Sequence, residues 1–240
     1  ITLPAWQDSW YGRTSRLYLS GFFLDMVKPL GPLVKFLNGK GYKTVICDGT
    51  TDEGSILPLK LAAVRAGLGW QGKHSLLISK QYGTLLALGG IITDAKLDHN
   101  QKAEPNRCRD CDKCQQACPL GALEMPHVLN RNRCMSNCLA KEKLPDAVQA
   151  VMENRIGDCE ICQDACPWNK KHIERPLATK MTLSFQKQAA EWERTCYLPE
   201  LAMISEETFR RKFDKLNTSY AFDIFQRNVM LALKNAQQSN

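Results

Sequence analysis

The sequence predicts an α+β protein in three parts, and three observations support this prediction. Residues 1–100 mix apolar-faced helical segments with short apolar strands. Residues 101–175 hold most of the cysteines, spaced for short helices and loops. Residues 176–240 return to helix-forming sequence, expected to pack back on the core. With 240 residues the chain can bury a sizeable core in one large domain or two small ones.

The first part is expected to begin with helix over residues 1–41. Within it, GPLVKFLNGKG (31–41) places Pro32 at a helix start and glycines at its end. The apolar face of that helix comprises Leu33, Val34 and Leu37. YKTVICDG (42–49) predicts a strand closed by a turn.

A second helix is expected over residues 56–66, with Gly67 as its C-cap. SLLIS (75–79) and TLLALGGIIT (84–93), joined by KQYG, predict a hairpin of buried strands. The polar stretch at 94–106 contains a proline and is a plausible domain junction.

Towards the C-terminus, SEETFRRKF (205–213) predicts a helix that opens with a capping box. RNVMLALKNA (227–236) predicts another helix, with Val229 and Leu233 on its apolar face.

The composition is that of an ordinary globular protein, with 44% hydrophobic and 24% charged residues. No apolar run is long enough to span a membrane, and LYLSGFFL (17–24) lacks the layout of a signal peptide. Free thiolates favour a reducing compartment, so a cytoplasmic location is expected. Because the chain begins at Ile1 rather than Met, a preceding segment is expected in the longer protein.

The formal charge of +7 is spread over several short basic runs, which are usually solvated faces. This charge permits a polyanionic partner and does not by itself indicate one.

Nine of the eleven cysteines lie between Cys108 and Cys166, at spacings that suit metal ligands better than disulfides. CRDCDKCQQACP (108–119) has the C-x2-C-x2-C-x3-C-P spacing of bacterial ferredoxins. CEICQDACPWN (159–169) is one cysteine short, because Ile156 stands where the first cysteine would be. The middle part is therefore expected to be a two-cluster ferredoxin-like domain.

In two-cluster ferredoxins the last cysteine of each run binds the cluster of the other run. This rule predicts one [4Fe-4S] cluster on Cys108, Cys111, Cys114 and Cys166. The second cluster would take Cys118, Cys159 and Cys162. Either Cys134 or Cys138, in RNRCMSNCLAKE, could complete it.

Zinc is the alternative, since eight cysteines could form two tetrahedral sites. The four-cysteine run and the Cys-Pro ending of both runs favour clusters. Cys47 and Cys196 lie outside the pattern and are expected to be buried as small hydrophobic residues. Two clusters move single electrons, which implies an electron donor and something to reduce.

A second informative stretch is AGLGWQGKHSLLI (66–78), where three glycines follow a helix. It is not a dinucleotide fingerprint, because the order is helix, loop, strand and Trp70 follows the G-x-G. By itself it indicates no more than a tight connection in which the backbone approaches a neighbour closely.

Over residues 42–240 the chain resembles the epoxyqueuosine reductase family, cobalamin-dependent iron–sulfur enzymes related to reductive dehalogenases. The resemblance rests on AGLGWQGKHSLLI, GTLLALGGIITD, the cysteine series, NRIGDCEICQDACPWN and RNVMLALKNA. Members of the family usually have more sequence before Ile1, and many carry a helical-repeat extension that this chain lacks. The resemblance implies a cobalamin-binding α/β-sandwich-like domain over residues 1–100.

The resemblance also implies roles for particular residues. Cys134 matches the family's single cysteine between the two runs, which leaves Cys138 spare. The pocket for base-off cobalamin would comprise Trp70, Gly72, Lys73 and Leu77, with Asp158 and Cys159 approaching from the ferredoxin side. The family places an acidic proton donor in a V-D-S/T triplet about seventeen residues before the Trp. Here Glu53 stands at that position, next to Asp52, within TTDEGS. The triplet itself is absent, so these could also be solvated loop acids.

The implied activity is reduction, through Co(I) cobalamin, of the epoxide of a modified nucleoside at a tRNA wobble position. The implied partners are tRNA and a ferredoxin- or flavodoxin-type electron donor, with no membrane, and the chain is expected to be a monomer. One alternative is a related reductase that acts on a small molecule or reactivates a corrinoid enzyme. Another is a ferredoxin-type electron carrier without catalysis, which would leave the first hundred residues unexplained.

Overall fold

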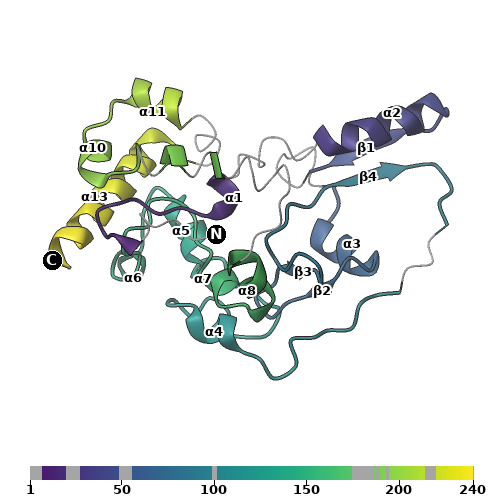
Figure 1. Cartoon of the computed structure of the whole chain (residues 1–240), viewed down its shortest axis with the longest axis horizontal. Helices are drawn as coiled ribbons and strands as arrows, with labels where there is room; N and C mark the ends of the chain where they lie inside the picture. Colours follow the sequence, from purple (N-terminus) through teal and green to yellow (C-terminus); the bar gives the residue numbers. More distant parts are fainter. Residues whose placement is uncertain are drawn as a thin grey trace.

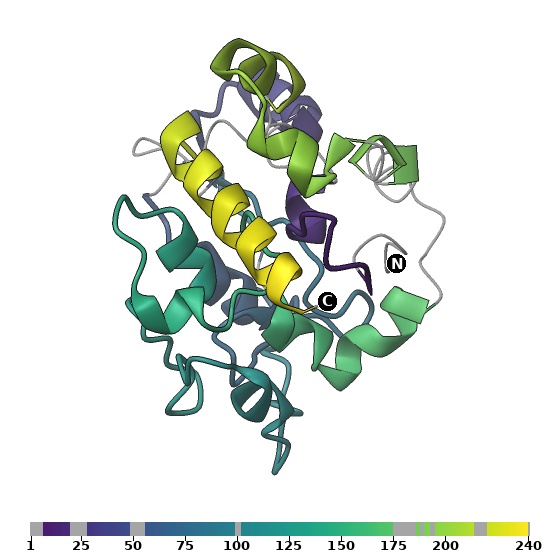
Figure 2. The same cartoon turned by 90° about the vertical axis from the view of Figure 1, so that its left-hand side faces the viewer.

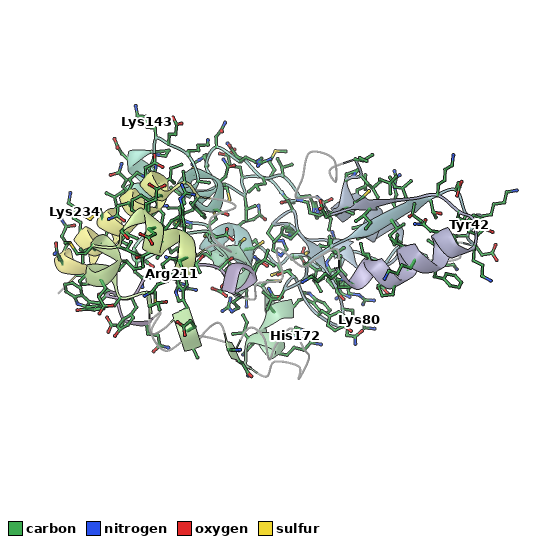
Figure 3. All side chains as sticks on the ribbon, turned by 90° about the horizontal axis from the view of Figure 1, so that it is seen from above. Tyr42, Lys80, Lys143, His172, Arg211 and Lys234 are labelled. Atoms are coloured by element: carbon green, nitrogen blue, oxygen red, sulfur yellow. The ribbon has the colours of Figure 1, made fainter. Side chains whose placement is uncertain are left out.

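A computed structural model describes residues 7–19, 28–48, 56–98, 102–174, 186–187, 190–192, 195–213 and 220–239. The chain is elongated, with Tyr42 near one end and Lys143 and Lys234 near the other (Figure 3).

The helices are α1 (Arg16–Leu19), α2 (Gly31–Gly39), α3 (Leu59–Arg65), α4 (Lys113–Ala117), α5 (Met135–Leu139), α6 (Asp146–Gln149), α7 (Ile161–Asp164), α8 (Pro167–Glu174), α10 (Leu198–Ala202), α11 (Glu206–Lys212) and α13 (Phe222–Gln238). A 3-10 turn, η2 (Lys28–Leu30), leads into α2. The strands are β1 (Thr44–Cys47), β2 (Trp70–Gln71), β3 (Leu77–Ile78) and β4 (Gly90–Thr93). One lobe holds β1 to β4 with α2 and α3, and the other is helical; α4, α7 and α8 lie between them (Figure 1).

The strands form two separate antiparallel pairs, β1 with β4 and β2 with β3. The predicted hairpin between residues 75–79 and 84–93 is therefore wrong, apart from an isolated bridge between Ser79 and Gly83. Residues 77–78 pair instead with β2, which precedes them in the sequence, because Gly69 lets the two backbones approach closely. A Cβ at Gly69 would lie 2.1 Å from the carbonyl oxygen of Ile78.

Residues 7–15 contradict the helix expected over 1–41, because their backbone bonds to distant segments. The amide of Gly12 donates to Cys196, and that of Arg13 donates to Asn154. The amide of Ile156 donates back to the carbonyl of Arg13. Tertiary hydrogen bonds thus override the local preference for helix. The stretches 1–6 and 20–27 lie outside the described residues.

Several local predictions are confirmed. α2 begins with Gly31-Pro32 and buries Leu37, although Leu33 of the expected apolar face is half exposed. α3 is followed by Gly67 with φ 73°, the left-handed geometry of a glycine C-cap. The Ser205 hydroxyl accepts a hydrogen bond from the Thr208 amide at the start of α11.

The main core lies in the helical lobe, where α13 crosses the other helices (Figure 2). It joins residues from α5, α6, α10, α11 and α13 with Trp192 and Cys196. Asn228 is fully buried in this core, and its Nδ2 donates to the carbonyls of Leu139 and Ile156, each at 3.1 Å. The side chain of Asn228 thus holds both the backbone that follows Cys138 and the backbone that precedes Cys159. Among the helices that the structure describes, none is long and apolar enough to cross a membrane.

The strand-containing lobe is fastened to α8 through Asn169, whose side chain is fully buried. Its Oδ1 accepts from the Thr84 amide at 2.7 Å, and its Nδ2 donates to the Thr84 hydroxyl and the Gln163 carbonyl. Gly83 makes this contact possible, since a Cβ there would lie 2.1 Å from Asn169 Oδ1. These hydrogen bonds of Asn169 hold the loop after β3 against α8, the helix that follows Cys166.

We expect Asn228→Leu to destabilise the protein by about 1–3 kcal/mol, because the buried Ile156 carbonyl loses its donor, while the Leu139 carbonyl keeps a bond from Arg227. Thermal unfolding of the anaerobic protein, followed by circular dichroism, measures the loss as a lower midpoint. Asn235→Ala is the matched control on the same helix, since Asn235 makes one exposed bond to the Glu153 carbonyl. Equal midpoints for the two variants would contradict the role assigned to Asn228.

Candidate functional site

The first cysteine run wraps around α4. A turn places Cys111, with its amide donating to the Cys108 carbonyl at 2.9 Å, and Arg109 between them takes a left-handed φ of 44°. Cys114 lies within α4 and Cys118 is its C-cap. Because the helix is this short, the chain curls around a point and directs its thiols towards a common centre.

The second run repeats this arrangement around α7. Cys159 precedes the helix, Cys162 lies within it, and Cys166 stands between it and α8. α4 and α7 pack against each other, so the two runs lie side by side (Figure 1).

One set of cysteines surrounds a cavity of about 200 Å³, and comprises Cys108, Cys111, Cys114 and Cys166. Lys73, His74, Ile78, Arg107, Pro167 and Trp168 complete its walls. Burial and the neighbouring thiols of Cys108, Cys114 and Cys111 together raise the pKa of Cys166 to about 11. The structure therefore brings the last cysteine of the second run to the first three of the first run.

A second set comprises Cys118, Cys134, Cys159 and Cys162. Burial raises the pKa of Cys162 most, and the thiols of Cys159 and Cys134 add to the effect, with Cys114 and Cys118 also contributing. Burial likewise raises the pKa of Cys159 to about 11, with Cys134 acting in the same direction. Cys134 is the N-cap of α5 and faces this set from the intervening loop.

These thiols fit metal coordination by their chemistry. Buried thiols that raise one another's pKa stay protonated without a cation, and metal binding reverses this by stabilising thiolates. In the part of the chain that the structure describes, no three His, Cys, Asp or Glu side chains are arranged to hold a single metal ion. The first set instead encloses a cavity with room for a polynuclear group.

Cys138 is placed differently from Cys134, although the two are one helical turn apart. Its side chain is fully buried in the main core beside Met135 and Leu139. Its Sγ donates to the carbonyl of Asn132 at 3.2 Å. Cys47 and Cys196 are also fully buried, which confirms the expectation for both.

Asp158 holds the loop that carries Cys159. Its carboxylate accepts hydrogen bonds from the hydroxyls of Ser15 and Ser136 and from the Cys159 amide. Its own amide donates to the Tyr220 hydroxyl at 2.8 Å, and its φ of 52° is left-handed. The side chain therefore ties together four segments around the second cysteine set.

A buried ion-pair network beside the second run was not predicted from the sequence. Arg16 pairs with Glu160 and Asp164, each at 2.6 Å, and Arg13 pairs with Asp164 at 2.9 Å. Burial raises the pKa of Glu160 to about 7, although Arg16 acts against this shift. Two acids four positions apart among the cysteines, Glu160 and Asp164, were the only signal in the sequence, and their partners lie about 150 residues away.

The glycine-rich segment lies against the first cysteine set. Trp70 and Leu77 are buried, and the Trp70 ring meets Trp168 edge-on at 4.8 Å between centroids. Lys73 is half-buried and faces the cavity of the first set. Gly72 is also buried, and a Cβ there would lie 2.5 Å from Cε1 of His74.

His74 itself was not among the predicted site residues. Burial lowers its pKa to about 4, with His127 and Lys60 acting in the same direction, so the ring is neutral near pH 7. The expected proton donors Asp52 and Glu53 lie outside the described residues.

The 4Fe-4S double cluster binding domain family matches residues 107–169. This segment includes both cysteine runs and the loop between them, so the expected pair of [4Fe-4S] clusters is supported over the zinc alternative.

Curated relatives and solved structures extend the similarity beyond that segment. The epoxyqueuosine reductase of Escherichia coli strain K12 is 34% identical over 188 residues, which are 77% of this chain and 47% of the relative. That of Cyclobacterium marinum is 33% identical over 173 residues, 70% of this chain and 52% of the relative. The chain thus spans about half the length of these curated relatives.

Among solved structures, an epoxyqueuosine reductase with a tRNA-Tyr epoxyqueuosine-modified stem loop matches with a TM-score of 0.77 and 26% identity. The match covers 95% of this chain and 57% of that one. The Bacillus subtilis enzyme, with its catalytic loop swung out of the active site, matches with a TM-score of 0.74, also at 26% identity, over 96% of this chain and 57% of that one. Over the aligned span, this chain shares its fold with epoxyqueuosine reductases.

Proposed function

We propose that the chain reduces the epoxide of a modified nucleoside in the anticodon loop of tRNA, as an epoxyqueuosine reductase. The observation that carries the proposal is the contact between a cluster-sized cysteine cavity and the glycine-rich segment at 66–78. Similarity to an epoxyqueuosine reductase solved with its tRNA stem loop, over 95% of this chain, supports it.

The cluster ligands follow from the two cysteine sets. We assign one [4Fe-4S] cluster to Cys108, Cys111, Cys114 and Cys166, and the other to Cys118, Cys134, Cys159 and Cys162. The pKa of Cys166 is raised by the other three thiols of its set, and the largest thiol effects on Cys162 come from Cys159 and Cys134, which supports this division. The burial of Cys138 in the main core and its hydrogen bond to the Asn132 carbonyl support leaving it out of both clusters.

An external donor of single electrons, of the ferredoxin or flavodoxin type, would load the clusters. Reduction of an epoxide needs two electrons and protons for the departing oxygen. Two clusters on packed helices, α4 and α7, form a short path for those electrons. The path ends at the glycine-rich segment, beside the first cysteine set.

Cobalamin is the cofactor proposed for the pocket near Trp70, Gly72, Lys73 and Leu77, with Asp158 on the facing side. Bound cobalamin would supply a strongly reducing, nucleophilic cobalt centre. The hydroxyls of Thr14 and Ser75 are buried without a partner among the described residues, and a corrin carries peripheral amides that could satisfy them. Thr14 lies next to Gly157, so this polar edge adjoins Asp158.

Proton delivery is assigned to Glu53 or Asp52, which precede the glycine-rich segment. A carboxyl at the substrate must be protonated to serve as an acid, and this requires burial that raises its pKa. Recognition of tRNA would combine phosphate contacts from basic side chains with a pocket for a splayed-out base.

A second candidate function is reduction of a small molecule with the same cofactors. It is favoured by the sequence TTDEGS, which departs from the acidic triplet of the epoxyqueuosine reductases.

We expect Cys134→Ser to lose one cluster and about half of the bound iron, because each cluster takes four thiolates. Iron analysis and EPR of the anaerobically reconstituted, reduced protein measure the loss. Cys138→Ser is the matched control one turn away and should keep both clusters. The reverse outcome would exchange the assignment of the two cysteines, and bound zinc without iron would exclude clusters.

Cob(II)alamin added to the reconstituted protein should give a five-coordinate, base-off EPR spectrum. Trp70→Ala should weaken this binding, since it opens the buried packing between the glycine-rich segment and Trp168. Tyr42→Ala, at the far end of the same lobe, should leave binding unchanged (Figure 3). A spectrum that stays that of free cobalamin would exclude the pocket.

With both cofactors and a chemical reductant, the protein should convert an epoxyqueuosine-containing stem loop to the reduced nucleoside, detected by mass spectrometry. Binding of the stem loop should weaken steeply with salt, because phosphate contacts release counterions. Glu53→Gln or Asp52→Asn should lower turnover by about a hundredfold or more, since a hundredfold is the lower end of what a general acid contributes.

Absence of binding at low salt, with cofactors loaded, would favour the small-molecule function. Full turnover by both acid variants would leave the proton donor elsewhere in the chain.

A further inference from the structure

His74 places a buried imidazole in the wall of the cavity that the first cysteine set encloses. The residue is 3% exposed, and the cavity wall also holds Cys108, Cys111, Cys114 and Cys166. None of the expected roles of the glycine-rich segment uses this side chain. A polar group buried this deeply normally has a hydrogen-bond partner.

The tautomer of the ring follows from its contacts. The Leu76 amide donates to Nδ1 at 3.2 Å, so Nδ1 carries a lone pair. In a neutral imidazole the proton then sits on Nε2, which becomes a donor. Nε2 has no hydrogen-bond partner among the residues that the structure describes.

Gly72 fixes the direction in which the ring points. A Cβ on Gly72 would lie 2.5 Å from Cε1 and 3.0 Å from Nδ1 of His74, so the imidazole rests directly on the glycine backbone. The Nδ1 edge is thereby turned towards Gly72 and Leu76. The opposite edge, with Nε2, is left to face the cavity.

We propose that the Nε2–H of His74 donates a hydrogen bond to a sulfur of the cluster bound in this cavity, and that this bond raises the cluster's reduction potential. Reduction adds negative charge to the cluster, so a donor to sulfur stabilises the reduced state more than the oxidised state. His74 acts here as a positioning and tuning residue for electron transfer. The inference rests on the cluster assignment proposed above.

Other donors near the cavity are less suited to this role. Arg107 has an unpartnered Nε, but its side chain is about one-third exposed and bonds to Glu104. Lys73 is half-buried, and water would screen its charge. Trp70 has a buried, unpartnered Nε1, but the residue is not part of the cavity wall.

The test is a redox titration of the anaerobically reconstituted protein, monitored by EPR, in wild type and His74→Leu. We expect one of the two cluster potentials to be ~59 mV lower in His74→Leu than in wild type. For a one-electron couple, this shift corresponds to about a tenfold lower ratio of reduced to oxidised cluster at a given potential. The other potential should not move. His74→Gln keeps an amide donor near the position of Nε2, so its cluster potential should lie closer to the wild-type value than that of His74→Leu.

An independent readout is the exchangeable proton itself. Electron–nuclear double resonance of the reduced cluster should show a proton coupling in wild type that disappears in deuterated water and is absent in His74→Leu. Cys166→Ser identifies which potential belongs to this cluster, because it alters a ligand of that site alone. Gly72→Ala should lower the same potential by displacing the ring, even though the histidine is retained.

His172→Leu is the matched control. Its Nε2 is likewise buried without a partner among the described residues, but it lies on α8 near Lys80 and outside the cavity wall (Figure 3). Both potentials should stay at their wild-type values in this variant. Clusters that load fully in His74→Leu with both potentials unchanged would overturn the role of His74 alone. A wild-type protein that binds no cluster would overturn the cluster assignment as well.

Discussion

The stability of the central region depends on how cysteines on very short helices are kept together. α4, α5 and α7 have five, five and four residues, far below the length at which an isolated helix is stable in water. Without a metal, burial and the neighbouring thiols raise the pKa of these cysteines, as at Cys162, and so disfavour their ionisation. Metal coordination and contacts from outside the region must therefore supply the order that local helix formation cannot.

Beside the apolar packing of α5 in the main core, several of those outside contacts are polar, and each of these spans a long stretch of chain. Asn228 holds the backbone after Cys138 and before Cys159, and Asp158 joins Ser15, Ser136 and Tyr220 around the Cys159 loop. Such bonds are directional, so they fix where a backbone lies more sharply than apolar packing does. Placing cluster ligands requires this precision, which explains why buried polar side chains gather beside the cysteines.

Local signals in the sequence were sufficient where a structure depends on neighbours in the chain. Cysteine spacing predicted which runs bind metal, and caps predicted α2, α3 and α11. Residues 7–15 and strand β4 were mispredicted, because their hydrogen bonds are made with segments far away in sequence. The same limit left Cys134 and Cys138 open by spacing alone. Only the packing of α5 separates the thiol that faces the second set from the thiol in the core.

Residues 69–74 pack closely against two neighbours, the wall of the first cysteine cavity and strand β3. On one side His74 faces the first cysteine set; on the other, the segment would contact cobalamin. A side chain at Gly72 would move the imidazole, and one at Gly69 would push β2 away from β3. Either change would alter the cluster environment and the cofactor pocket together. The two glycines are therefore explained by close packing: Gly72 leaves room for the His74 ring, and Gly69 lets β2 approach the backbone of β3.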